Sequence, residues 1–423
     1  MAKVPGSAGF PLVGDRSYDF YKDPIKFQNK HMENTKSRVF LSRFLNKPTI
    51  FIGSNAILQE VLKDHAHDME LGYKQFMGEI YGENIIFSDG NCAESLRETL
   101  KHLFTSEAVQ SYQSTIDRVV KKAIGTLEDG KTFCVYQFFK KLAVEICLSL
   151  FLGLDFSESE AEVISQLTTT HWHGIISVPV AIKVPKMSES TYSKALDAKR
   201  KLLDIIQKRR EEKCHSFPQK VEALPDLEEI LVNNHLLLFT SALVPKALSS
   251  ILTSFVIEVG HKEKKDLQDD MLENEDLLES VVLEVLRLYP PFIGGRRVIA
   301  QEFTAGGYRM PAGHAILYLT YLAQRDPTVF DNPDEFKPGR WHGKNKDDRD
   351  KLFCFGSGPR SCLGQKLVWT IIKTVIKELM TNFKFTLEPG QDLEHKWLPV
   401  SRPKGNILVK LETRQTDGQK LDS

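Results

Sequence analysis

Apolar residues recur at helical spacing along most of this chain, and the pattern predicts a mainly α-helical protein. The longest helix of this kind runs through the apolar stretch 227–260, and another follows a cysteine-containing loop near the C-terminus. The predicted helices cover residues 56–62, a segment that begins near 93, 114–127, 135–152, 159–169, 191–210, 227–260, 279–289 and 365–382.

Strand patterns are few and short. Residues 38–45 and 48–53 are strand-like runs joined by Asn46-Lys47, which predicts a β-hairpin. Residues 294–298 and 308–318 read as further short strands. Between the hairpin and the first long helix, residues 64–90 are rich in Gly, Tyr and Phe and are expected to be irregular. The chain therefore combines many helices with one small β-region.

The composition gives no support for nucleic-acid binding, a membrane span or a disulfide framework. The 423 residues carry 56 basic and 56 acidic side chains, so the net charge gives no case for nucleic-acid binding. No run approaches the length of a membrane span. The six cysteines show neither paired CxxC spacing nor a disulfide-dense pattern, which favours a reducing compartment.

The stretch that carries chemistry is the loop before the last long helix. Gly356 and Gly358 permit backbone angles closed to other residues, and Pro359 stiffens the approach. Cys362 then stands just before a helix N-terminus, where the amides stabilise a thiolate, and Arg360 adds a positive charge. A thiolate of this kind is suited to bind iron. The alternative is an inert buried cysteine beside an ordinary Gly/Pro turn.

The spacing Phe355-x-x-Gly358-x-Arg360-x-Cys362-x-Gly364 resembles the haem-binding loop of the cytochrome P450 family. The resemblance implies one catalytic domain over residues 1–423, mainly α with a small β-region, with haem b between the long central helix and the cysteine-loop helix. Cys362 would be the axial iron ligand, and Phe355, Arg360 and Gly364 would contact the cofactor.

The same resemblance implies two further arginines at the haem propionates. Arg97 and Arg297 match these positions, and Arg296 is the fallback for Arg297. Relatives commonly carry an aromatic residue or His four positions before the first of these arginines, where this chain has Ala93. A plain surface arginine is the alternative for Arg97.

Three charged residues match structural motifs of the family. Glu284 and Arg287 stand three residues apart on one helix, ahead of Pro290-Pro291, and Arg340 matches the second arginine motif. The resemblance implies a buried network of these three groups that holds the loop of Cys362. Their role is structural, not catalytic.

The clearest departure from the family lies on the long central helix. Most oxygen-activating relatives carry an acid followed by Thr there, and these groups relay protons. This chain has Leu243 and Val244 at those positions, and Pro245 is expected to kink the helix. No catalytic residue is therefore assigned. The charged stretch 261–275 is also shorter than in relatives, through a deletion or an incomplete gene model.

The substrate pocket is expected to be apolar, and residues 64–90 resemble the loop that roofs it. The apolar break at 174–180 is expected to be pocket wall or membrane-facing surface. The nearby His171-Trp172-His173 is expected to be structural, because alternate residues of a helix do not share a face. The candidate pocket residues are Phe87, Thr240, Leu243, Val244, Phe292, Ile293, Leu398 and Val400.

Two reactions and one non-catalytic role stay open. The opening Pro-Gly-Ser and the stretch around Gly-Gly-Arg-Arg-Val look most like the branch that includes retinoic-acid hydroxylases and plant sterol or terpenoid oxidases. That likeness favours monooxygenation of a sterol, terpenoid, retinoid or fatty acid. The alternative is a hydroperoxide-rearranging isomerase or dehydratase, which needs no reductase and tolerates Leu243-Val244. The third hypothesis is an inactive haem-binding protein.

The expected partners follow from the resemblance. They are a lipophilic substrate and, for a monooxygenase, an NADPH-dependent reductase; peripheral membrane contact and a monomeric state are also expected. The location is the cytoplasmic face of the endoplasmic reticulum if an N-terminal anchor has been removed, and the cytoplasm otherwise. Residues 413–423 are polar and are expected to form a disordered tail.

Overall fold

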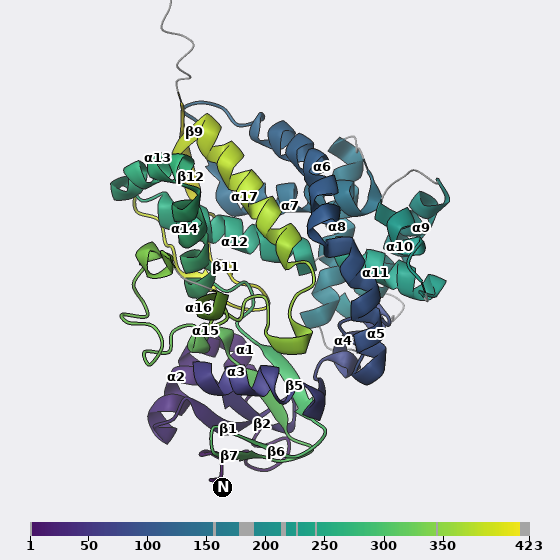
Figure 1. Ribbon diagram of the computed structural model, residues 1–423, viewed down its shortest axis with the longest axis vertical. Helices are drawn as coiled ribbons and strands as arrows, with labels where there is room; N and C mark the ends of the chain where they lie inside the picture. The colour runs from purple at the N-terminus through teal and green to yellow at the C-terminus, as the bar shows by residue number, and fades with distance from the viewer. Residues whose placement is uncertain are drawn as a thin grey trace, which may run out of the picture. The chain divides into compact units, whose positions relative to one another are not determined.

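The structure is a computed structural model that describes residues 2–154, 158–176, 190–212, 217–225, 227–241, 243–343 and 346–414. The chain forms two compact units, each assembled from separate segments. The first unit comprises Met1–Glu98, Leu286–Leu363 and Trp397–Ser401, and the second comprises Thr99–Val285, Gly364–Lys396 and Arg402–Ser423. Figure 1 traces the elements of both.

The first unit is organised around a five-stranded sheet in the order β1-β2-β8-β5-β3. The predicted hairpin is confirmed, since β1 (Val39–Phe44) and β2 (Lys47–Ile52) pair antiparallel. The other strands are β3 (Met69–Leu71), β5 (Gly295–Ile299) and β8 (Ala315–Tyr318), and β6 (Phe303–Ala305) pairs with β7 (Tyr308–Met310). Its helices are α1 (Ser17–Lys22), α2 (Pro24–Thr35), α3 (Asn55–Lys63), α4 (Lys74–Tyr81), α5 (Gly90–Leu100, up to Glu98), α15 (Thr320–Ala323), α16 (Lys346–Arg349) and the short 3₁₀ turns η1 (Ala66–Asp68), η5 (Pro338–Trp341) and η6 (Gly358–Arg360).

The two faces of this sheet bury different apolar clusters. Consecutive side chains of a strand point to opposite faces, and β5 pairs with β8 so that Arg296 stands opposite Leu317 and Arg297 opposite Ile316. Ile316 packs in a cluster with Leu62 and Met69, whereas Leu317 packs in a separate cluster around Phe40 and Phe51. The register therefore places Arg296 and Arg297 on opposite faces of the sheet.

The second unit is mainly helical, with a three-stranded sheet in the order β4-β12-β9. The helices α6 and α17 lie side by side in it (Figure 1). Its helices are α6 (Ser106–Ile124), α7 (Val135–Leu152), α8 (Glu158–His173), α9 (Thr191–Glu211), α10 (Phe217–Glu222), α11 (Glu229–Ser241), α12 (Leu243–Val259), α13 (Lys265–Glu273), α14 (Glu275–Leu288, up to Val285), α17 (Gln365–Asn382) and the 3₁₀ turns η2 (Lys101–Phe104), η3 (Gly174–Ile176) and η4 (Lys262–Lys264). Its strands are β4 (Thr132–Cys134), β9 (Phe383–Leu387), β10 (His395–Lys396), β11 (Arg402–Pro403) and β12 (Leu408–Thr413).

Two sequence expectations need correction. Residues 64–90 are not irregular, because they contain η1, β3 and α4. The charged stretch 261–275, for which no element was predicted, forms η4 and α13. The tail begins later than expected, since Thr413 still pairs with Phe383 and Arg414 donates a backbone hydrogen bond to the carbonyl of Asn382. Residues 415–423 lie outside the described part of the chain.

The predicted helix 227–260 is described as α11 and α12, and Ala242 between them lies outside the described residues. Pro245 lies within α12, and the kink expected there stays a prediction. Taken together, Glu229–Val259 is long and apolar enough to cross a membrane by length and composition alone, but 75% of the tested stretch is buried inside the protein, as in a core helix.

Candidate functional site

The loop of Cys362 is a tight turn built on two glycines. Gly356 and Gly358 have φ angles of 73° and 64°, which only glycine adopts without strain. A Cβ on Gly358 would lie 2.2 Å from the carbonyl oxygen of Leu62 in α3, so no larger residue fits there. The amide of Cys362 donates a hydrogen bond of 2.7 Å to the carbonyl of Phe355, and the Cys362 side chain is exposed. The loop therefore presents this thiol outward.

Cys362 does not lie within a helix. The 3₁₀ turn η6 ends at Arg360, and α17 begins at Gln365 with Gly364 as its N-cap. The thiol therefore stands just before a helix in the chain, as the spacing predicted. Gly364 occupies the cap position with φ of −82° and ψ of 10°.

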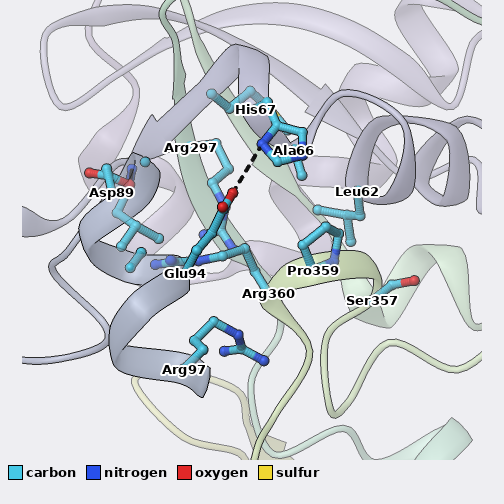
Figure 2. A pocket seen from close by; sticks show the side chains of 14 residues that line it. Leu62, Ala66, His67, Asp89, Glu94, Arg97, Arg297, Ser357, Pro359 and Arg360 are labelled. Atoms are coloured by element: carbon cyan, nitrogen blue, oxygen red, sulfur yellow. Dashed lines mark hydrogen bonds and ion pairs between the residues drawn. The ribbon is translucent and has the colours of Figure 1, made fainter. Parts of the chain in front are cut away.

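A cavity in the first unit brings three arginines together. Its lining includes Arg97 of α5, Arg297 of β5 and Arg360 of η6, and Ala93 lines the same cavity. The side chains of Glu94, Arg297 and Arg360 gather at its centre (Figure 2). Glu94 also pairs with His67 across the mouth, at 3.5 Å.

The arginines of this cavity influence one another and Cys362. Burial lowers the pKa of Arg360. The positive charges of Arg297 and Arg97 lower this pKa further, whereas Asp89 raises it. Burial also lowers the pKa of Arg97, whereas the nearby Cys362 raises it. The guanidinium of Arg97 donates to the carbonyl of Ser361, directly before Cys362. Three like charges close together favour an anionic partner, and Arg97 favours the thiolate of Cys362.

The neighbouring thiol is very different. Burial raises the pKa of Cys354 to about 12, so its thiol stays protonated at neutral pH. Burial raises the pKa of Cys147 as well. Of these cysteines, Cys362 alone combines exposure with a nearby guanidinium.

Two of the three charged residues with a predicted structural role are buried. Glu284 and Arg287 on α14 are both 0% exposed. Arg287 donates to the carbonyls of Pro333 and Glu335, at 2.6 and 3.0 Å, and Arg340 pairs with Asp331 at 3.0 Å. Arg287 therefore anchors the backbone of residues 333–335, and Arg340 is paired with Asp331 just before this segment. The network of all three groups stays a prediction.

Sequence reasoning missed Gln324. Its side-chain amide donates to the carbonyls of Leu286 and Arg287, both at 2.9 Å, and accepts from the amide of Phe353 at 2.7 Å. Gln324 therefore ties the end of α14 to the start of the cysteine loop. A lone glutamine after a short helix carries no sequence signal, because its partners lie far away along the chain.

The two hydroxyls that precede Leu243-Val244 in the chain, those of Thr240 and Ser241, are already engaged. Thr240 donates to the carbonyl of Leu236 at 2.8 Å, one turn back in α11. Ser241 is hydrogen-bonded to Nδ1 of the buried His171. Val244 is half-buried in α12, and the side chain of Leu243 lies outside what the structure describes. The hydroxyls of Thr240 and Ser241 therefore both have a hydrogen-bond partner within the protein.

The candidate pocket residues of the first unit differ in their surroundings. Ile293 packs in the cluster that holds Leu317, and Leu398 lies against that cluster. Phe87 and Val400 are buried, and Phe292 is half-buried. Their contact with a substrate stays a prediction, and residues 177–180 of the expected pocket wall lie outside the described part of the chain.

Comparisons with known proteins define the class of this fold. The cytochrome P450 family model matches residues 5–240 and 256–411. Putative cytochrome P450 120 of Synechocystis sp. is 24% identical over 97% of this chain and 96% of that protein. The structure of retinoic acid-bound cyanobacterial CYP120A1 superposes with a TM-score of 0.85 at 23% identity, covering 98% of this chain and 100% of that one. Cytochrome P450EX alpha (CYP152N1) with myristic acid gives a TM-score of 0.75 at 19% identity, with coverages of 98% and 100%.

The fold is that of a haem-thiolate oxidoreductase. The chain belongs to the cytochrome P450 family, and with it to the monooxygenase class of enzymes. Family membership implies a haem-thiolate iron cofactor, and the donors present here suit that group. An exposed thiol beside a guanidinium fits iron, and three arginines in one cavity fit carboxylates. The family model leaves residues 241–255 unmatched, and these residues include Leu243 and Val244.

Proposed function

We propose that this protein is a monooxygenase that uses haem b to oxidise a lipophilic small molecule of the retinoid or fatty-acid type. The observation that carries the proposal is the exposed Cys362 on its glycine loop, with Arg97 beside it. The bound ligands of the two solved relatives, retinoic acid and myristic acid, support the substrate class.

The residues take the following roles in this proposal. When bound, haem would supply a redox-active iron for dioxygen chemistry. Cys362 would bind this iron, and the nearby Arg97 favours the thiolate form of Cys362. Arg97, Arg297 and Arg360 would pair with the carboxylates of the haem, which would relieve the repulsion between the three like charges. Phe355 holds the amide of Cys362, and Gln324 fixes the start of the loop.

Rearrangement of a lipid hydroperoxide is the second candidate. It is favoured by Leu243 and Val244 at the start of α12, which stand at the positions expected to carry the acid and the alcohol. The adjacent Thr240 and Ser241 hydroxyls are engaged by Leu236 and His171, so they are not ready substitutes for a proton relay. A substrate that already contains an O–O bond needs no such relay.

One experiment separates these reactions. Haem-loaded protein is mixed with retinoic acid or myristic acid, NADPH and a reductase, and in parallel with a lipid hydroperoxide alone. Oxygenated product in the first arm only supports the monooxygenase. Product in the second arm only would replace it with the isomerase. Silence in both arms, with the reduced-CO spectrum of a thiolate-ligated haem, would leave an inactive haem-binding protein. A Cys362→Ser variant is the control in each arm.

The proposed partners are a lipophilic substrate and an NADPH-dependent reductase, with the protein acting as a monomer. Peripheral membrane contact is part of the proposal, and co-flotation with lipid vesicles tests it. The two alternative cellular locations, the endoplasmic reticulum surface and the cytoplasm, both stay predictions.

A further inference from the structure

Arg296 is a buried cation whose donors are largely unused. The residue is 0% exposed. Its Nη1 donates to the carbonyl of Gly72 at 2.6 Å, but its Nε and Nη2 have no hydrogen-bond partner. Buried donors are nearly always satisfied in native proteins, so two such atoms on one side chain call for a ligand.

The unused atoms form one edge of the guanidinium. Nε and Nη2 lie on the same side of the planar group, and their N–H bonds are parallel. This fork matches the two oxygens of a carboxylate, which accept a pair of charge-assisted hydrogen bonds. The remaining donor, Nη1, is the one that the protein itself anchors, through Gly72.

The protein supplies no counter-ion for this charge. Among the residues that the structure describes, no carboxylate pairs with Arg296. Burial lowers the pKa of Arg296, and the nearby Tyr73 raises it. The Phe76 ring lies 5.8 Å from the guanidinium carbon, which adds an apolar wall. A buried charge without a partner is strongly destabilising, so a bound anion would offset a large penalty.

The local backbone is shaped around this side chain. A Cβ on Gly72 would lie 2.6 Å from Cγ of Arg296, so only glycine allows the approach. Gly72 lies two residues before the start of α4, and Arg296 thereby links β5 to the segment expected to roof the substrate pocket.

Arg296 and Arg297 serve different ligands because they lie on opposite faces of β5. Arg297 lines the cavity with Arg97 and Arg360, the proposed propionate site. Arg296 shares its face with Leu317, whose apolar cluster includes the pocket candidate Ile293.

We propose that Arg296 binds the carboxylate of the substrate, so that the protein selects lipophilic carboxylic acids over the matching esters and alcohols. This inference rests on the proposed function and specifies the substrate class of the same site. A hydrophobic pocket alone discriminates poorly between such analogues, whereas a charged fork that is left unpaired rejects them.

The test compares binding, and it needs no reductase. Haem-loaded protein is titrated with retinoic acid, methyl retinoate and retinol, by haem absorbance and by equilibrium dialysis. The variants are Arg296→Met, which removes the charge, and Arg296→Lys, which keeps the charge but removes the fork. Arg297→Met is the matched control on the opposite face of the same strand, and haem content is measured for all of them.

The wild type is expected to bind the acid at least about tenfold more tightly than the ester or the alcohol. Arg296→Met should weaken acid binding by about 10- to 100-fold and ester binding by less than about twofold, with haem content unchanged. Arg296→Lys should lose part of the preference. Arg297→Met should lower haem content and keep the preference.

Three results would overturn the inference. The first is a wild type without preference for the acid, which decides the matter even if Arg296→Met does not fold. The second is equal weakening of acid and ester in Arg296→Lys. The third is loss of haem in Arg296→Met with the preference intact, which would assign Arg296 to a propionate. If the protein prefers the acid but shows no reductase-dependent turnover, the proposed monooxygenase reaction is wrong, whereas the assignment of Arg296 to the carboxylate is supported.

Discussion

Cys354 and Cys362 belong to one loop but differ in the protonation of their thiols. Burial holds the pKa of Cys354 near 12, whereas Cys362 is exposed and lies near Arg97. Iodoacetamide reacts with thiolates. At pH 8 it should therefore modify Cys362 and spare Cys354 in haem-free protein, and haem loading should protect Cys362. Peptide mass spectrometry measures both sites.

The exposed Cys92 is the internal control, because it lies outside the loop and should be modified equally in both states. Unchanged modification of Cys362 after haem loading would contradict its role as the axial ligand.

Gln324 is a second residue whose role can be measured. Gln324→Leu keeps the size of the side chain but removes two donated hydrogen bonds and leaves the amide of Phe353 without its acceptor. We expect a loss of about 2–4 kcal/mol in the free energy of unfolding, together with lower haem retention, because the cysteine loop loses its anchor. Urea unfolding followed by circular dichroism measures the first effect.

Gln301→Leu is the matched control, because Gln301 is exposed. It should change the free energy of unfolding by less than about 0.5 kcal/mol. Equal effects of the two substitutions would argue against an anchoring role for Gln324.

Residues that belong to a spaced motif were predictable, and residues that act through distant partners were not. The turn glycines Gly356 and Gly358 have the φ angles that the motif demanded. Arg97 and Arg297 line one cavity, although about 200 residues separate them in the chain. Gln324 and the unpaired fork of Arg296 depend on long-range contacts, and neither residue type is unusual at its position.

Among the elements, long amphipathic helices and the strands of the hairpin were predicted well, whereas the short strand β3 was not. The bounds Val135–Leu152 of α7 and Gln365–Asn382 of α17 agree with the prediction, because their apolar positions persist over many turns. The strand β3 has three residues and exists through its pairing with β5, about 230 positions further along the chain. No local pattern encodes such a pairing, which explains the wrong prediction for residues 64–90.

The helix α11 contains a histidine that should make the protein sensitive to acid. Burial lowers the pKa of His235 from its ordinary value of 6.5 to about 4. Between these values the unfolded chain binds a proton that the folded protein does not. Stability should therefore fall as the pH drops from 6.5 to 4, by about 3 kcal/mol from this residue. Chemical denaturation at a series of pH values measures it.

His235→Leu should flatten this part of the pH profile relative to the wild type. The exposed His102 provides the control, and His102→Gln should keep the full slope. A His235→Leu profile as steep as the wild type would show that other groups cause the acid sensitivity.

At the scale of the whole molecule, the two compact units share continuous helices. The division between the units falls inside α5, after Glu98, and inside α14, after Val285. The buried Glu284 and Arg287 stand one turn apart on α14, on either side of that division. If one unit unfolded alone, these helices would have to break at the division, and we therefore expect the chain to behave as a single catalytic domain.

We therefore expect haem-loaded protein to unfold in one cooperative transition. Helical circular dichroism reports mainly on the second unit, and haem absorbance reports on the surroundings of Cys362 in the first. Coincident urea midpoints from the two probes would support one domain. Loss of the haem signal at a clearly lower midpoint, with a second helical transition above it, would mean that the units unfold separately. Because haem release alone also changes the haem absorbance, tryptophan fluorescence should be followed as well, in haem-free protein that carries Trp172→Phe and Trp369→Phe. In this variant only Trp341 and Trp397 of the first unit remain.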